Sequence, residues 1–264
     1  TLFLALVLCV VGAYGEDDPN PPTIHSSHGA WPLARQWTVP ETQHFAKWIE
    51  NIYRLKTTGT DAQRLAKLER VLTDPEMNLL LDPAFAGERA NPQLGPETMR
   101  AMHTVLDCGK LTVALSTYYA YRRGLPWMQS YVCPANGGDL RTTDYNIPLG
   151  AICSWNYSSA HDFFVDAVTG LCTGNFRVEL NRRNSEMSDT LPVAIDKRYL
   201  IPGCLFYLDG HVLVVASVDK YGEPRFLDST TAITRDIFAH NGLNAVTGMV
   251  VPTAEDGDLS GCYR

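Results

Sequence analysis

The pattern of hydrophobic and polar residues divides the chain into a helical first half and a second half that contains several strands. Apolar residues recur with helical spacing after Pro40 and again after Thr60, which predicts two amphipathic helices. A further helix is predicted over residues 158–171, with Ser158 or Ser159 as its cap. The inward faces of these three helices would carry Phe45, Trp48, Ile49, Ile52, Leu65, Leu68, Val71, Leu72, Phe163, Phe164, Ala167 and Val168.

The most apolar helix is predicted to begin at Cys108. Leu111, Leu115 and Tyr118 have the spacing of one helix face, which indicates that the body of this helix is buried. The sequence Arg122-Arg123-Gly124, followed by Pro126, supplies cations, a permissive residue after the last turn and a stop. Cys108 would therefore lie at the mouth of a buried helix.

Three short strands are predicted near the C-terminus, over residues 203–208, 211–218 and 224–228. Asp209-Gly210 and the segment 219–222 separate them and are strong turn signals. Helices followed by an antiparallel meander are typical of an α+β fold. Three other segments lack a hydrophobic period and are predicted to be loops, namely residues 78–96, 127–155 and 181–189.

The first fifteen residues are apolar and uncharged, and they resemble the hydrophobic part and small-residue end of a secretory signal peptide. We therefore expect a secreted or periplasmic protein, with no stable membrane insertion after signal cleavage. The predicted organisation is a signal peptide over 1–15, an extended tether over 16–40, an N-terminal helical segment over 41–95, a catalytic domain over 96–252 and a C-terminal tail over 253–264.

Composition excludes some functions. The 264 residues carry a net charge of −7 and no long basic run, which argues against a nucleic-acid partner. No spacing typical of a metal site or of a glycine-rich phosphate loop occurs, so we expect neither a metal nor a cofactor. We expect a monomer that acts on a peptide or a peptidoglycan-like amide.

Candidate chemistry lies in Cys108, His211 and Asp228. The partial positive charge of a helix N-terminus stabilises a thiolate, which makes Cys108 a candidate nucleophile. His211 opens a strand directly after a turn, and Asp228 ends the next strand. If the hairpin folds about Asp219 and Lys220, the histidine and the aspartate lie opposite each other on one sheet face. A turn centred two residues later would offset them by four residues, and a bulge would then be needed.

Disulfide formation is the rival interpretation of the same cysteine. Removal of Cys9 with the signal peptide would leave six cysteines, enough for three disulfides in an exported protein. Cys108 would then be a structural staple. If Cys108 is free, we favour the pairs 133–153 and 172–204, with Cys262 left over, although sequence does not fix the connectivity.

Three blocks of the sequence resemble the transglutaminase-like branch of the papain-like cysteine peptidase superfamily, in particular its exported members of bacterial type. These blocks are residues 107–126, 202–215 and 226–228, within a region that extends over about residues 98–251. The resemblance implies a nucleophile helix packed against a small antiparallel sheet. It also implies a Cys108, His211 and Asp228 triad that cleaves an amide through a thioester.

The sequence departs from this family beside the nucleophile. Gly109 follows Cys108 where tryptophan is usual, and Met102 stands where papain-like proteases place glutamine, so the second oxyanion donor is unassigned. Nothing resembles the calcium sites of animal transglutaminases. We therefore favour hydrolysis. The alternatives are a transglutaminase or other acyltransferase, an NlpC/P60-like amidase, and an inactive binding module with Cys108 in a disulfide.

Overall fold

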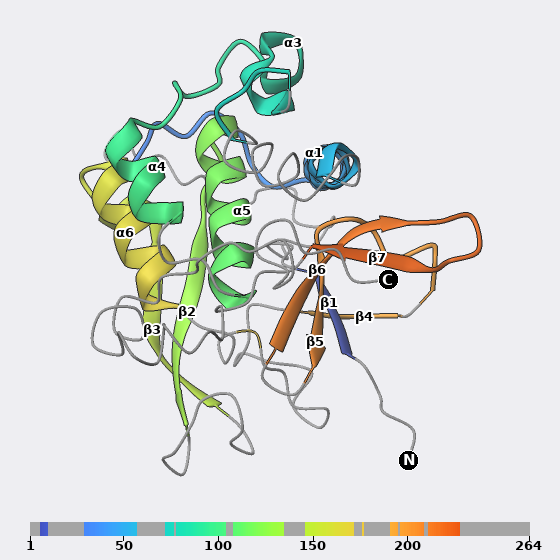
Figure 1. Ribbon diagram of the computed structural model, residues 1–264. Helices are drawn as coiled ribbons and strands as arrows, with labels where there is room; N and C mark the ends of the chain where they lie inside the picture. The colour runs from blue at the N-terminus through green and yellow to red at the C-terminus, as the bar shows by residue number, and fades with distance from the viewer. Residues whose placement is uncertain are drawn as a thin grey trace, which may run out of the picture.

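The computed structural model describes residues 6–9, 29–56, 72–76, 78–103, 108–134, 146–171, 176, 191–194, 196–208 and 211–227. Its helices are α1 (Val39–Lys56), η1 (Leu79–Leu81), α3 (Pro83–Ala86), α4 (Pro96–His103), α5 (Cys108–Arg123), η2 (Ser154–Asn156) and α6 (Ala160–Gly170). Its strands are β1 (Leu6–Cys9), β2 (Met128–Pro134), β3 (Asn146–Cys153), β4 (Leu191–Val193), β5 (Cys204–Leu208), β6 (His211–Val218) and β7 (Pro224–Leu227). Helices and small antiparallel sheets together make an α+β fold, as expected (Figure 1).

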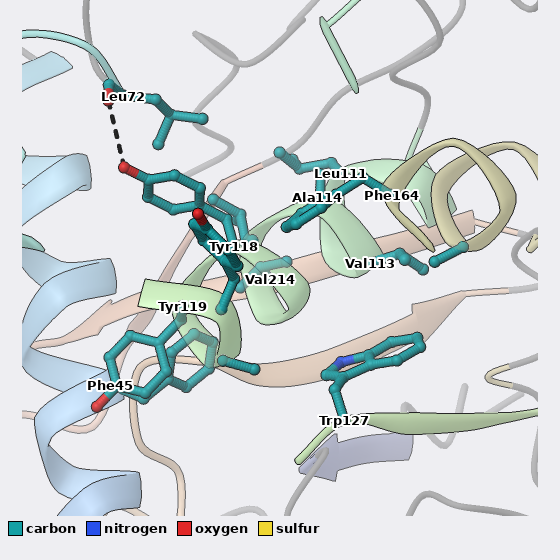
Figure 2. Packing of buried hydrophobic residues seen from close by; sticks show 14 of the residues in the cluster. Phe45, Leu72, Leu111, Val113, Ala114, Tyr118, Tyr119, Trp127, Phe164 and Val214 are labelled. Carbon is teal, nitrogen blue, oxygen red and sulfur yellow. Dashed lines mark hydrogen bonds between the residues drawn. The ribbon is translucent and has the colours of Figure 1, made fainter. Parts of the chain in front are cut away.

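Helix α5 is the central element of the fold. Nearly every residue after Cys108 is buried, including the polar Thr112, Ser116 and Thr117. The hydroxyls of these three side chains donate to backbone carbonyls one turn earlier in the same helix, which satisfies them without an outside partner. The predicted apolar stripe was therefore too narrow. Figure 2 shows side chains of α5 that point in several directions, together with Phe164 of α6 and Val214 of β6 from the same core.

The larger sheet has five antiparallel strands in the order β4-β1-β5-β6-β7. One face joins the main core through Leu205, Val212 and Val214, and α5 packs against β6 on this side. The other face carries a smaller apolar cluster that includes Leu213 and Val215. The alternation of strand residues explains why adjacent positions belong to different clusters.

Strand β1 lies within the stretch that sequence analysis assigns to a signal peptide. Leu6–Cys9 pairs with both β4 and β5, which makes it an internal strand of the sheet. Cleavage after residue 15 would remove this strand, so the two roles exclude each other in one mature chain. None of the described helices is both long and apolar enough to cross a membrane.

The smaller sheet corrects one expectation. Residues 127–155 were predicted to be a loop, but β2 and β3 form an antiparallel hairpin with a bulge between Tyr131 and Val132. Exposed Met128 and buried Gln129 begin β2 with the alternation of a half-buried strand. The Cys-Pro-Ala-Asn-Gly-Gly sequence after Val132 is rich in turn residues, and it led to the prediction of a loop over the whole segment.

Residues 29–38 form an extended strap across the end of α5. This segment belongs to the predicted tether, and it is extended, but Ala30 and Trp31 are buried. Its N–H groups donate to the backbone carbonyls that follow the helix: Trp31 Nε1 to Leu125 O at 2.9 Å, Ala34 N to Gly124 O at 2.8 Å and Trp37 Nε1 to Pro126 O at 2.8 Å. The strap therefore supplies donors to the segment that follows α5, and Arg35 Nη1 also donates to the carbonyl of Arg123, the last residue of the helix, at 2.7 Å.

The remaining helical predictions have mixed outcomes. Helix α1 is confirmed, with its predicted inward residues buried, and α6 is confirmed with a Ser159 cap that accepts from Asp162 N. The predicted loop over 78–96 contains the short η1 and α3, and it shares one core with α5 through Leu80 and Leu94. The helix predicted after Thr60, apart from buried Leu72, and the loop over 181–189 lie outside the described residues.

Candidate functional site

Cys108 is the first residue of α5, as predicted. Its side chain is half-buried and carries a free thiol, whereas Gly109 and Leu111 are buried. The Thr112 hydroxyl donates to the Cys108 carbonyl at 3.3 Å and holds the first turn of the helix. The backbone N–H groups of a first helical turn have no partner within the helix, so they are natural donors to an oxyanion beside this sulfur.

The preferred disulfide pairing is wrong. No disulfide joins the described cysteines Cys108, Cys153 and Cys204. Cys133 lies opposite Ile147 in the hairpin, six residues from Cys153. At about 3.3 Å per residue, this separation is far beyond the Cα distance of about 6 Å that a disulfide spans. Cys172 lies outside the described residues, and its predicted partner Cys204 forms no disulfide.

His211 is the first residue of β6 and is half-buried. Cys108 and His211 thus begin two elements that pack against each other, α5 and β6. Strand alternation, however, assigns His211 to the face of Leu213 and Val215, whereas α5 packs on the face of Val212 and Val214. The structure therefore packs α5 against β6, but it assigns His211 to the face of the sheet that α5 does not cover.

The register of the final hairpin differs from the one that would pair His211 with Asp228. That register requires Leu227 opposite Val212, but Leu227 lies opposite Val214. The register shifts between Val215 and Ser217 because a bulge interrupts the ladder. Asp228 itself lies outside the described residues, so its predicted role as orienter of the histidine stays a prediction.

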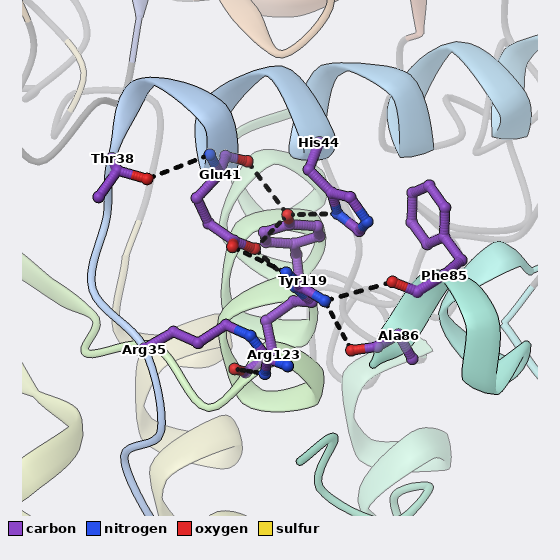
Figure 3. A network of polar contacts seen from close by, with 8 residues as sticks. All are labelled: Arg35, Thr38, Glu41, His44, Phe85, Ala86, Tyr119 and Arg123. Atoms are coloured by element: carbon purple, nitrogen blue, oxygen red, sulfur yellow. Dashed lines mark hydrogen bonds and ion pairs between the residues drawn. The ribbon is translucent and has the colours of Figure 1, made fainter. Parts of the chain in front are cut away.

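A buried polar network is the main feature that sequence analysis missed. Glu41 on α1 forms a bidentate ion pair with Arg123 at the end of α5 (Figure 3). The Tyr119 hydroxyl donates to Glu41 Oε1 at 2.6 Å, and it also lies 2.8 Å from His44 Nδ1. Arg123 Nη1 donates to the carbonyls of Phe85 and Ala86. The network joins α1, α5 and α3.

The single proton of the Tyr119 hydroxyl fixes the roles of its neighbours. Because the hydroxyl donates this proton to the Glu41 carboxylate in a hydrogen bond, the contact with His44 Nδ1 fits the tautomer whose Nδ1 carries a proton and donates to the phenol oxygen. Burial and the hydrogen bond to Glu41 both raise the pKa of Tyr119, so the phenol keeps its proton. Burial lowers the pKa of His44, and the charge of Arg123 lowers it further. The network is suited to a structural role, because its groups keep fixed protonation states and so keep the hydrogen bonds that join the helices.

No signal in the sequence marks this network. Arg122 and Arg123 are typical cations of a last helical turn, and Glu41 is a typical acid of a first turn. Their partners lie about eighty positions apart in the chain, beyond any local pattern. Within the described residues, no group of three or more potential ligands is arranged to hold a metal ion.

Comparison of the chain with protein-family models, with curated proteins and with solved structures finds no match. The resemblance to papain-like peptidases therefore rests on the three sequence blocks alone.

Proposed function

We propose that this chain is a cysteine hydrolase that cleaves an amide bond of a peptide or a cell-wall-type substrate, with Cys108 as its nucleophile. One observation carries the proposal: a free, half-buried thiol is the first residue of a helix that is otherwise almost entirely buried. The N-terminus of such a helix favours a thiolate and supplies N–H donors to a developing oxyanion. A papain-like arrangement of the α+β fold belongs to the same proposal.

The proposed reaction has two steps. The Cys108 thiol gives its proton to His211 and its sulfur attacks the carbonyl carbon, and the C–N bond then breaks as His211 passes that proton to the leaving amine. Water then attacks the thioester with His211 as base, which releases the acid and restores the thiol. Asp228 would orient the imidazole and support its protonated form.

A second function, that of a non-catalytic binding module, is favoured by a different observation. Alternation along β6 assigns His211 to the sheet face opposite α5, and a base on that face would not reach the thiol. His211 is the catalytic base in the first function and has no catalytic role in the second. The thiol and the histidine must therefore be tested in separate experiments.

Hydrolysis of an amide library by Cys108→Ser and by wild-type protein tests the enzymatic function. We expect turnover in the wild type, none in Cys108→Ser, and unchanged turnover in Cys153→Ala, which removes a thiol of β3 outside the proposed site and keeps this buried position apolar. Equal turnover by Cys108→Ser and wild type would contradict the proposal. An added amine distinguishes the alternatives, since capture of the acyl group by the amine rather than by water indicates a transferase.

Export is proposed from the sequence alone, and it competes with the strand assigned to Leu6–Cys9. N-terminal sequencing of the mature protein decides between them. A mature chain that begins near Glu16 supports export with cleavage, and a mature chain that keeps Leu6–Cys9 supports β1 as a permanent strand.

A further inference from the structure

Two neighbouring turns at one end of the larger sheet expose tyrosines. Tyr199 closes the turn that begins at Asp196, and it is 55% exposed. Tyr221 lies in the turn between β6 and β7, and it is 77% exposed. The turns touch, because a Cβ on Gly222 would lie 3.6 Å from Cβ of Lys197. Figure 1 shows the β6–β7 hairpin projecting away from α5.

Each exposed tyrosine ring has a cation beside it. The guanidinium of Arg198 lies 5.4 Å from the ring centroid of Tyr199, and the ammonium of Lys220 lies 4.8 Å from that of Tyr221. We call Lys197, Arg198, Tyr199, Lys220 and Tyr221 the tyrosine platform. Tyrosine and arginine are the residues that most often anchor protein interfaces, because they bury a large surface with few rotatable bonds.

Both turns are fixed before any ligand arrives. Asp196 Oδ1 accepts from Arg198 N at 2.9 Å, and Asp219 Oδ1 accepts from Tyr221 N at 2.8 Å and from Glu223 N at 2.9 Å. Gly222 has a φ of +91°, which the second turn requires and which other residues rarely adopt. A platform on preorganised turns loses little conformational entropy when it binds.

The platform is locally cationic within an acidic chain. Four basic and three acidic residues occupy positions 196–200 and 219–225, whereas the whole chain has a net charge of −7. Arg198 and Arg225 form ion pairs with Asp196 and Glu223. Lys197 and Lys220 are exposed and form no ion pair with any described residue, so their two ammonium groups are open to a ligand.

We propose that the tyrosine platform is a docking surface for a short acidic peptide segment of a partner protein. Its carboxylates would pair with Lys197 and Lys220, and its apolar side chains would cover Tyr199 and Tyr221. At physiological salt, screening limits the range of an exposed charge to about 8 Å. A short ligand on the platform therefore interacts with its cations and not with the acidic remainder of the chain. A long polyanion or an anionic membrane would meet both, which favours a peptide.

This surface is independent of the proposed thiol chemistry. Strand β6 separates it from His211, and seven residue steps along a strand span about 23 Å. Loss of the Cys108 thiol should therefore leave peptide docking unchanged, and loss of the platform should leave Cys108 labelling unchanged.

Fluorescence polarisation with a labelled tetrapeptide of alternating glutamate and leucine, short enough to meet the platform alone, tests the proposal on the full chain. We expect the acidic peptide to bind and a lysine–leucine counterpart to fail. Tyr221→Ser and Lys220→Glu should each weaken binding about ten-fold. Val39→Ser removes another exposed apolar side chain, which is 51% exposed and lies on α1, and should change nothing.

Three results would overturn the proposal. They are no binding of the acidic peptide to the wild type, equal affinity of the wild type and both platform variants, and binding of heparin or phosphatidylserine vesicles without binding of the peptide. Tyr199→Ser provides an independent variant at the second turn, and the same loss of affinity is expected from it.

Discussion

Glu41 and Arg123 form a bidentate ion pair, with 2.6 Å from Arg123 Nε to Glu41 Oε1 and 2.8 Å from Nη2 to Oε2. Both residues are buried, at 7% and 9% exposure. Because Arg123 also donates to the carbonyls of Phe85 and Ala86, the pair joins the start of α1 to the end of α5 and to α3. The pair therefore fixes the end of α5 that lies opposite Cys108.

Removal of the Glu41 charge should destabilise the fold strongly. Glu41→Gln leaves the guanidinium of Arg123 buried without its counter-charge, and we expect the free energy of unfolding to fall by about 3–5 kcal/mol. Urea denaturation measures this. The control is Arg198→Gln, which breaks an exposed ion pair with Asp196 and should have little effect. Equal losses of unfolding free energy in the two variants would mean that the buried ion pair contributes no more to stability than an exposed one.

Stability should fall with acid in two separate windows. Burial and the charge of Arg123 lower the pKa of His44, so the unfolded chain binds this proton more readily than the folded one. Stability from neutral His44 is present above its ordinary value of 6.5 and is lost as pH falls below it. Burial raises the pKa of Glu41, but hydrogen bonds from Arg123 and Tyr119 outweigh this and leave it lowered. Stability from this carboxylate is lost below 4.5.

Urea unfolding of His44→Gln across this pH range separates the two windows. Glutamine keeps a donor for Tyr119 but does not titrate, so the upper window should disappear while the lower one remains. An unchanged pH profile in His44→Gln would show that another group causes the upper window.

Asn78 should be the most sensitive polar residue between α1 and α5. It is fully buried, and its Oδ1 accepts from Trp48 Nε1 at 2.9 Å while its Nδ2 donates to Tyr118 Oη at 2.9 Å. Asn78→Ala leaves the indole N–H buried without a partner, and we expect a loss of about 2 kcal/mol or more in urea denaturation. Asn156→Ala, at an exposed position, is the control. A near-neutral Asn78→Ala would show that water replaces the amide.

Gly124 should not tolerate a side chain. Its φ is +65°, and a Cβ there would lie 3.1 Å from Ala34 Cβ and 3.2 Å from Pro32 O in the strap. We expect Gly124→Ala to lower the free energy of unfolding by about 1–3 kcal/mol. Gly150→Ala meets nothing within 4 Å and should be nearly neutral. A neutral Gly124→Ala would mean that the strap is held only loosely against the helix.

Local patterns were sufficient to predict α1, α5, α6 and the final meander. The period of apolar residues located α1 and α6, and Gly124 correctly marked the end of α5. The β2–β3 hairpin was missed because turn residues between the strands dominated the interpretation of that segment. The strap was missed because its hydrogen bonds join residues about ninety positions apart, and nothing in a single sequence indicates such contacts.

The candidate site was predicted in part. The position of Cys108 follows from local helix signals, and it is where the sequence indicated. The relation between His211 and Asp228 depends on the register of one hairpin, and a bulge between Val215 and Ser217 changes that register. A bulge inserts one extra residue into one strand, and the alternation of apolar residues in the sequence does not show where this happens.

The most direct test of the central claim is the rate at which iodoacetamide alkylates Cys108 in the native protein below pH 7, followed by mass mapping. We predict that Cys108 reacts first, ahead of the buried Cys153 and Cys204, and that His211→Ala abolishes this preference. His161→Ala, which removes a histidine bonded to Thr98, should leave it unchanged. Equal labelling of Cys108 in wild type and His211→Ala would contradict the proposed catalytic pair, and Cys108 found in a disulfide would contradict the enzyme altogether.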